Sequence, residues 1–166
     1  IDTKSKNGTM AAEVKYPIGD QSFGEIIRNG CVYVDKTAYI HKMVTEGKYY
    51  FLSRPRRFGK SLLVSTLEEY FRGNRELFSG LAIDRLEPEE WNSHPVLHLD
   101  LNGKDYTNPS ALYEQLEMHL DNWEATYGRN GNVPSVDNRF REVIKSAYVK
   151  TGCRVAVLID EYDKPI

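Results

Sequence analysis

The sequence predicts an α/β fold built around a parallel sheet that is flanked by helices. Stretches typical of strands alternate with stretches of helical periodicity along the 166 residues. The clearest strand is the apolar run 155–159, which is typical of a central parallel strand buried on both faces. A compact apolar stretch at 49–52 precedes a polar loop and then a helical pattern, so we expect a strand, a loop and a helix there.

The composition is that of one globular domain or part of a larger one. Apolar residues make up 40% of the chain, and 22 Lys and Arg against 24 Asp and Glu leave a net charge of −2. These values exclude wholesale disorder and a globally basic nucleic-acid binder, although not a local basic patch. We find no apolar run near the roughly 20 residues needed to span a bilayer, no signal peptide and no CxxC pair, and we therefore expect a cytoplasmic protein with no membrane partner.

The chain divides into two parts. Residues 1–15 are polar and lack apolar periodicity, so we expect a disordered N-terminal arm or a tag remnant. Residues 16–166 are expected to be the N-terminal portion of one domain. A central parallel strand needs neighbours on both sides, and few other strands are available, so we expect an incomplete sheet and further strands beyond residue 166.

Start and stop signals place the other elements. Ser22 and Glu25 fit a capping box before a short helix, and Asp35 or Thr37 is expected to cap the next one. Residues 74–95 look irregular because prolines interrupt them. The expected strands are 32–34, 49–52, 96–101 and 155–159, and the expected longer helices are 60–72, one from 108 to Gly128 and one that carries Phe140 and ends near Gly152.

Gly59, Lys60 and Ser61 stand where the strand 49–52 and its loop give way to a helix. Backbone N–H groups at a helix start point at phosphate oxygens, helped by the helix dipole, and a lysine adds a positive charge. A serine hydroxyl is a hard oxygen ligand for Mg²⁺. The pattern predicts a P-loop, or Walker A motif, whose nucleotide-binding residues are Arg56, Arg57, Phe58, Gly59, Lys60, Ser61 and Leu62.

The match to GxxxxGK[ST] has one departure, because Arg54 stands where the first glycine is expected. That glycine often serves a backbone geometry that arginine tolerates poorly. The tripeptide also arises by chance, and Lys60 would then be a solvated helix N-terminus and Ser61 a spare cap. Its position between a strand and a helix favours the phosphate-binding interpretation.

Asp160 and Glu161 follow the apolar run at its carboxyl end, the edge where open α/β sheets bind ligands. There Asp160 can hold Mg²⁺ together with Ser61, and Glu161 can orient or deprotonate an attacking water. The alternative is an exposed acidic turn. Because this Walker B pattern follows the glycine-lysine-serine pattern in the right order, the two together predict a P-loop nucleoside triphosphatase.

Other charged residues leave alternatives open. Arg54, Arg56 and Arg57 could add charge for a triphosphate, contact a neighbouring subunit or meet a nucleic-acid backbone, or they could form a solvated basic loop. His98 and Asp100 alternate on one strand face, where a half-exposed face is favoured over a metal pair.

With these motifs, the sequence resembles the AAA-ATPase-like family of bacterial proteins, in which the ATPase part usually precedes a PD-(D/E)XK nuclease-like domain. The resemblance covers residues 16–166. In that family arginine commonly stands where the first P-loop glycine is expected, so Arg54 is similar to a family variant. The matching stretches are 17–19, 33–37, 49–63, 76–81, 95–100 and 158–166, and the stretch 49–63 is highly specific.

The resemblance implies an ASCE-type P-loop fold that uses ATP and Mg²⁺. It implies phosphate and Mg²⁺ contacts by Lys60 and Ser61, a metal acid at Asp160 and a catalytic acid at Glu161. It also implies that the sensor strand lies beyond residue 166, so we expect inefficient hydrolysis by this chain alone. The resulting gap in the sheet could invite strand exchange between copies, that is, a homo-oligomer.

Three functions stay open. The first is an ATPase coupled in the full-length protein to a nuclease-like domain, with DNA or RNA as a partner. The second is a nucleotide-dependent switch with little hydrolysis, and the third is a nucleic-acid-binding module that uses the arginine loop without ATP. Glu161 favours the first, because a pure binder needs no base beside its metal acid.

Overall fold

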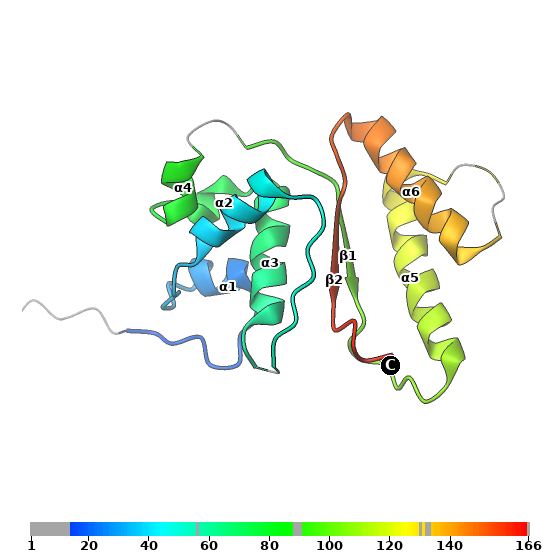
Figure 1. Cartoon of the computed structure of the whole chain (residues 1–166), viewed down its shortest axis with the longest axis horizontal. Coiled ribbons are helices and arrows are strands. Elements are labelled where there is room, and N and C mark those ends of the chain that lie inside the picture. The colour runs from blue at the N-terminus through cyan, green and yellow to red at the C-terminus, as the bar shows by residue number, and fades with distance from the viewer. Residues whose placement is uncertain (1–13, 56, 88–90, 130, 132–133, 166) are drawn as a thin grey trace, which may run out of the picture.

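A parallel sheet of two strands lies between two groups of helices in the computed structural model (Figure 1). The structure describes residues 14–55, 57–87, 91–129, 131 and 134–165. Strand β1 (Val96–Asp100) pairs with β2 (Ala156–Asp160), in a register that sets Val96 opposite Ala156 and Asp100 opposite Asp160. The mixed α/β class and the parallel pairing are therefore confirmed.

One group of helices packs through α3 (Lys60–Phe71), which contacts both strands (Figure 1). Phe23, Phe78 and Leu158 belong to the core on this side of the sheet. The region 74–95, expected to be irregular, contains the short 3-10 helix η1 (Arg75–Phe78) and the helix α4 (Ala82–Leu86), so that expectation is wrong. The remaining elements of this group are α1 (Phe23–Arg28) and α2 (Thr37–Glu46).

The second group covers the other face of β1 and consists of α5 (Pro109–Tyr127) and α6 (Val136–Thr151). Its core contains Leu97 from the sheet together with Leu120 and Val143. Both helices end where predicted, at glycines whose φ angles are positive, 96° at Gly128 and 69° at Gly152. A positive φ costs glycine little, and this is why these residues end helices well.

The residues predicted to cap the first two helices accept hydrogen bonds from backbone N–H groups at the helix starts. Ser22 is the N-cap of α1, and its hydroxyl accepts the Glu25 backbone N–H at 3.4 Å. The Ser22 N–H itself is donated to Asp20 Oδ1 at 2.9 Å. At α2 the acceptor is Asp35, whose Oδ1 accepts the Thr37 N–H at 2.8 Å. These bonds satisfy donors that the first turn of a helix leaves unpaired.

Two expected strands, 32–34 and 49–52, are not strands in the described chain. Next to the first, the pairing is a single bridge between Lys15 and Cys31. The second contacts the turn after β2: the Phe51 and Tyr162 ring centroids are 5.0 Å apart, and the Tyr162 hydroxyl donates to the Leu52 carbonyl at 3.4 Å. An apolar stretch becomes a strand only when a neighbouring backbone completes its ladder, and apolar composition does not supply one.

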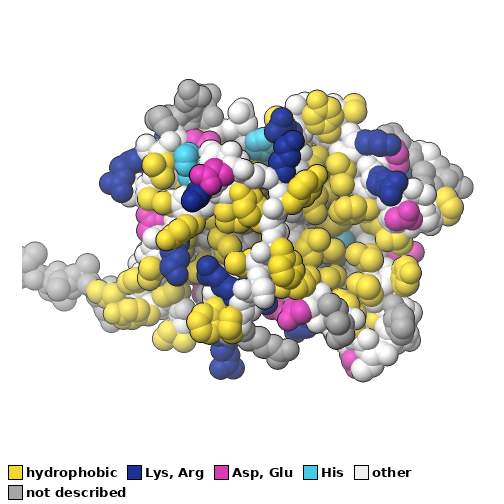
Figure 2. All heavy atoms as spheres, in the orientation of Figure 1, with side chains coloured by type: hydrophobic (Ala, Val, Ile, Leu, Met, Phe, Trp, Pro, Cys, Tyr) yellow, Lys and Arg dark blue, Asp and Glu magenta, His cyan; other side chains and the backbone are white. Residues whose placement is uncertain are grey.

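The expectation that the 155–159 strand is buried on both faces is also wrong. Leu158 is buried on the α3 side, whereas Val157 and Ile159 are 39% and 48% exposed. These two residues lie opposite Leu97 and Leu99 in the register, so they share the face toward α5 and α6. The helices cover that face of β1 but not of β2. Figure 2 shows hydrophobic side chains across the middle of the molecule.

No helix in the described part of the chain is long and apolar enough to cross a membrane.

Candidate functional site

A pocket of about 290 Å³ lies between α3 and the carboxyl ends of β1 and β2. It brings together Ser61, Asp160 and Glu161, which are far apart in the sequence. The register explains this, because residues opposite each other in a parallel pair face the same side, and Asp100 and Asp160 are such a pair at the strand ends. The pocket is lined by Gln21, Ser22, Ser61, Ser65, Glu68, His98, Asp100, Asn102, Asp160 and Glu161.

Helix α3 begins at the pocket without a side-chain cap. Its N-cap is Gly59, whose φ of 74° and ψ of 28° are left-handed. The Gly59 carbonyl accepts the first bond of the helix, from the Leu63 N–H at 3.0 Å. The N–H groups of the first turn therefore point out of the helix end, where its dipole is positive. Such a helix start can receive an anion.

The arginine at the first-glycine position does not occupy a left-handed backbone. Among the described non-glycine residues, positive φ occurs at Arg57 (66°) and Glu161 (55°), and not at Arg54. The backbone geometry that disfavours arginine therefore lies three residues further along, at Arg57. Arg54 is compatible with this loop, and the departure from GxxxxGK[ST] brings no backbone strain at that position.

The other predicted loop residues are placed in different ways. The Lys60 ammonium lies 5.7 Å from the centroid of the Tyr162 ring, so it is directed toward the end of β2 although it does not line the pocket. The Leu62 side chain packs on the core, which leaves only its backbone for ligand contact. Phe58 is 64% exposed. Arg56 lies outside the described residues.

The turn after β2 holds two carboxylates in a fixed relation. Asp160 is buried, and its Oδ1 accepts the Glu161 backbone N–H at 2.9 Å. Glu161 has a left-handed backbone, which costs a non-glycine residue roughly 1–2 kcal/mol. Strained residues of this kind gather at functional sites, so the observation makes Glu161 a candidate for function.

Five lining residues were missed by sequence reasoning: Gln21, Ser22, Ser65, Glu68 and Asn102. A signal for two of them was present, because Ser61, Ser65 and Glu68 are spaced by four and three residues and so share one face of α3. Ser65 also fixes α1, since its hydroxyl accepts the Phe23 N–H at 2.9 Å. Helical spacing could therefore have extended the predicted site along α3.

His98 and Asp100 occupy the face of β1 that looks toward α3. His98 Nδ1 lies 2.9 Å from Glu68 Oε2, and Glu68 also pairs with Arg72. The hydrogen bond with Glu68 is the largest cause that raises the pKa of His98, and burial opposes it. The half-exposed strand face favoured from the sequence is confirmed, since His98 is half-buried and Asp100 is exposed, and the His98 ring is in addition paired with Glu68.

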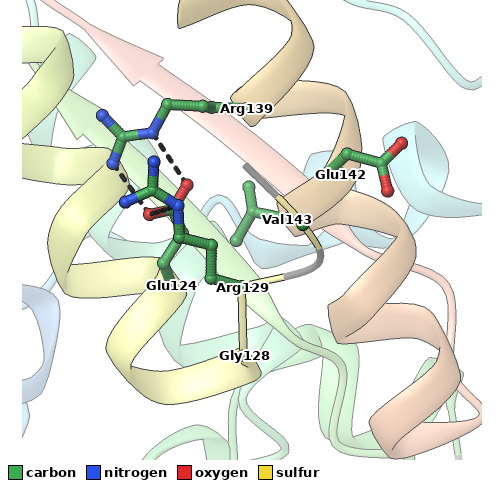
Figure 3. A pocket seen from close by; sticks show the side chains of 7 residues that line it. Glu124, Gly128, Arg129, Arg139, Glu142 and Val143 are labelled. Atoms are coloured by element: carbon green, nitrogen blue, oxygen red, sulfur yellow. Dashed lines mark hydrogen bonds and ion pairs between the residues drawn. The ribbon is translucent and has the colours of Figure 1, made fainter. Parts of the chain in front are cut away.

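A second hollow, of about 10 Å³, lies between α5 and α6 (Figure 3). Arg139 fills one side of it and is buried, with Nε and Nη2 each 2.8 Å from a Glu124 carboxylate oxygen and a further contact to Asp121 at 2.6 Å. The hydrogen bond from Arg139 lowers the pKa of Glu124. These side chains satisfy one another, which makes them a structural ion-pair cluster.

The donor set of the larger pocket fits a magnesium ion that arrives with a nucleotide. Mg²⁺ prefers oxygen ligands and is usually held by one or two carboxylates together with phosphate oxygens and waters. Ser61 and Asp160 offer a hydroxyl and a carboxylate in the same pocket. Among the residues that the structure describes, no group of three or more His, Cys, Asp or Glu side chains is arranged to hold a metal ion.

Comparison with known proteins gives one family and one relative. The model of the AAA-ATPase-like family, described as predicted AAA-ATPase, matches residues 17–166. An uncharacterized protein in the vnfD 5' region of Azotobacter chroococcum mcd 1 is 43% identical over 156 residues, which cover 92% of this chain and 30% of that protein. The chain thus spans about a third of the length of the relative. No solved structure matches it. The match over nearly the whole described chain shows that this protein belongs to the AAA-ATPase-like family.

Proposed function

We propose that this chain binds ATP with Mg²⁺ in the pocket between α3, β1 and β2 and that the full-length protein hydrolyses the ATP bound there. The observation that carries the proposal is the meeting of Ser61, Asp160 and Glu161 in one pocket of about 290 Å³. Membership of a family described as predicted AAA-ATPases supports nucleotide binding and hydrolysis as the general activity. The P-loop fold and the individual roles below are parts of this proposal.

The phosphates are proposed to bind at the start of α3. The first-turn N–H groups and the helix dipole favour an anion there. The Lys60 ammonium adds a positive charge, and its position over the Tyr162 ring keeps it near the carboxyl end of β2. The pocket itself is lined by four carboxylates, those of Glu68, Asp100, Asp160 and Glu161. Lys60 therefore offsets repulsion between these carboxylates and a triphosphate.

Ser61 and Asp160 are the residues proposed to hold Mg²⁺. When bound, the ion supplies positive charge that stabilises the charge developing on the transferred phosphoryl group. Asp160 is positioned for this role because its Oδ1 bond to the Glu161 N–H fixes the carboxylate. Ser61 stands in the first turn of α3 and faces the same pocket.

Glu161 is proposed to orient the attacking water and to accept its proton. Its carboxylate lines the pocket, and the adjacent peptide N–H is tied to Asp160 at 2.9 Å. The two carboxylates therefore take separate roles, one toward the metal and one toward the water. The coupling of this activity to a nuclease-like domain and to DNA or RNA remains a prediction from the family resemblance.

The test is a calorimetric titration of Mg²⁺-ATP into the full chain and into Lys60→Ala. We expect binding in the parent and a loss of at least tenfold in affinity in Lys60→Ala, because the variant removes a charge next to the phosphates. The matched control is Lys145→Ala, which removes an exposed lysine on α6 and should bind like the parent. Equal binding by parent and Lys60→Ala would overturn the proposed phosphate site.

A second measurement, made on the full-length protein, separates hydrolysis from binding. Glu161→Gln keeps the size of the side chain but removes the base, so we expect unchanged ATP affinity and loss of phosphate release. Asp163→Asn is the matched control, since it removes an exposed carboxylate from the same turn. Phosphate release by Glu161→Gln at the rate of the parent would show that Glu161 is not the base.

A further inference from the structure

His98 lines the pocket, and one of its ring nitrogens is held by a carboxylate while the other is buried without a partner among the described residues. Its Nδ1 bonds to Glu68 Oε2 at 2.9 Å, across the interface between β1 and α3. Its Nε2 is buried and has no hydrogen-bond partner among the residues that the structure describes. A buried polar nitrogen without a partner costs free energy, and such groups often mark a ligand or catalytic position.

Glu68 fixes how the ring can act. Because the carboxylate accepts from Nδ1, the proton of the neutral ring lies on Nδ1, and protonation of the ring places an N–H on Nε2. The ring cannot turn without breaking this bond, and Arg72 holds Glu68 from the other side. The ring, and Nε2 with it, is therefore held in one orientation.

The surroundings of His98 favour its cationic form. Glu68, Asp100 and Asp160 act together to raise its pKa against the effect of burial. In that form Nε2 is a charged donor that lacks an acceptor. The natural complement is an anionic oxygen, and the same pocket contains Ser61 and Asp160, the residues proposed to hold Mg²⁺ against the outer phosphates.

We propose that His98 Nε2 donates a hydrogen bond to the outermost phosphate group of the bound nucleotide, with Glu68 as the positioning residue that orients the ring. The inference rests on the proposed nucleotide site and adds a residue that distinguishes a triphosphate from a diphosphate. The contact forms only when the third phosphate is present. His98 then provides a preference for ATP over ADP that neither the P-loop nor the Walker B pattern contains.

Two variants separate this role from a structural one. His98→Asn retains an amide nitrogen near the position of Nδ1, which can still donate to Glu68, but has no atom at Nε2. His98→Gln carries its amide nitrogen near the position of Nε2. His94→Gln is the matched control, since His94 does not line the pocket and its Nδ1 lies 2.9 Å from the Arg154 carbonyl oxygen.

The experiment is a calorimetric titration of each protein with Mg²⁺-ATP and with Mg²⁺-ADP. For His98→Asn we expect about a tenfold loss of ATP affinity, the value of one charge-assisted hydrogen bond, with ADP affinity changed less than about twofold. His98→Gln should regain part of the ATP affinity, and His94→Gln should match the parent. Equal ATP affinity in His98→Asn and the parent, or equal losses for both nucleotides, would overturn the inference.

The parent protein gives an independent readout if a variant does not fold. Its four histidines can be followed by NMR, and His98 Nε2 should shift on addition of ATP and not of ADP. Binding of both nucleotides without such a difference would overturn the role of His98 and leave the proposed function standing. Failure of the parent to bind either nucleotide would overturn both.

Discussion

The carboxylate of Asp35 ties the start of α2 to the start of α4, because its Oδ2 accepts the Ala82 backbone N–H at 2.7 Å across 47 residues of sequence. Its Oδ1 accepts both the N–H and the hydroxyl proton of Thr37, at 2.8 and 2.7 Å. The Thr37 hydroxyl oxygen in turn accepts the Ile83 N–H at 3.1 Å. The side chains of Asp35 and Thr37 thus accept the first N–H groups of α2 and α4.

Replacing Asp35 with Ala should lower the free energy of unfolding by about 1–2 kcal/mol, because it leaves helix-start donors without acceptors. Chemical denaturation measures this. Asp105→Ala is the matched control, since Asp105 Oδ1 accepts only the local Thr107 N–H, at 3.1 Å. If both variants lose the same stability, the link between α2 and α4 is energetically unimportant.

The Asp35 effect should also depend on pH. Burial alone would raise the pKa of Asp35, but the hydrogen bonds from Thr37 and Ala82 outweigh it and lower the pKa below 3.8. An acid whose folded pKa is lowered stabilises the fold above its unfolded pKa and loses that contribution as pH falls. The difference between parent and Asp35→Ala should therefore be full at pH 6 and shrink below about pH 4. A difference that stays constant would contradict an ionised Asp35 as the acceptor.

Arg139 should be the most sensitive charged residue outside the pocket. Its side chain and that of Glu124 are each only 9% exposed and are joined by two hydrogen bonds (Figure 3). Removing Arg139 leaves the buried Glu124 carboxylate with Arg129 at 3.7 Å and without its two hydrogen bonds, so Arg139→Met should lower the free energy of unfolding by about 3 kcal/mol. Arg141→Met, on the exposed side of α6, is the control for the loss of an arginine.

The same pair allows a sharper test. In the double variant Arg139→Met with Glu124→Leu, the buried charge is absent, so stability should recover in part relative to Arg139→Met alone. Denaturation curves of the parent, the two single variants and the double variant form a mutant cycle. Additive losses in that cycle would show that the two side chains do not stabilise each other.

Much of the fold could be predicted from the sequence because hydrophobic periodicity reports which face of an element is buried. It placed α3, α5, α6, β1 and β2 to within a few residues. The stretches 32–34 and 49–52 were mistaken for strands because a strand also needs a partner for its backbone, which local composition cannot reveal. The apolar run 155–159 was expected to be buried on both faces. Its composition could not show that α5 and α6 cover β1 but not β2 on their side of the sheet.

The site could be predicted in part. Ser61, Asp160 and Glu161 stand at a helix start and after a strand end, positions that a parallel sheet brings together, and they line one pocket. The pairing of Glu68 with His98 was not found, because it depends on how α3 lies across β1. Local sequence patterns determine where each helix and strand begins and ends, whereas the contact between α3 and β1 is a tertiary one.

The loop before α3 gives a prediction about backbone strain. Arg57 has a φ of 66° and Arg54 does not have a positive φ, although Arg54 stands where a P-loop glycine is expected. Arg57→Gly should raise the free energy of unfolding by about 1 kcal/mol through relief of the left-handed conformation. Arg54→Gly should lower it by about 0.5–1 kcal/mol, because glycine adds entropy to the unfolded chain. If chemical denaturation shows Arg54→Gly to be more stable than Arg57→Gly, the loop geometry is contradicted.

The pair formed by Glu68 and His98 should stabilise the fold within a limited range of pH. The hydrogen bond with His98 lowers the pKa of Glu68 below 4.5, and the same bond raises the pKa of His98 above 6.5. The contribution of Glu68 is present above its unfolded pKa and is lost as pH falls. The contribution of His98 is fully present below its unfolded pKa and is lost as pH rises through the raised folded value.

Glu68→Gln should therefore cost the most stability between about pH 4.5 and 6.5, and less at both pH 3 and pH 9. The measurement is the free energy of unfolding of parent and variant across this range, with Glu76→Gln, an exposed glutamate of η1, as the control. If the penalty of Glu68→Gln falls at high pH, His98 has lost its charge there. If the penalty falls at low pH, Glu68 has become protonated there. A penalty that is the same from pH 3 to pH 9 would mean that the two groups hydrogen-bond without charge, and Nε2 would then not be a charged donor in the pocket.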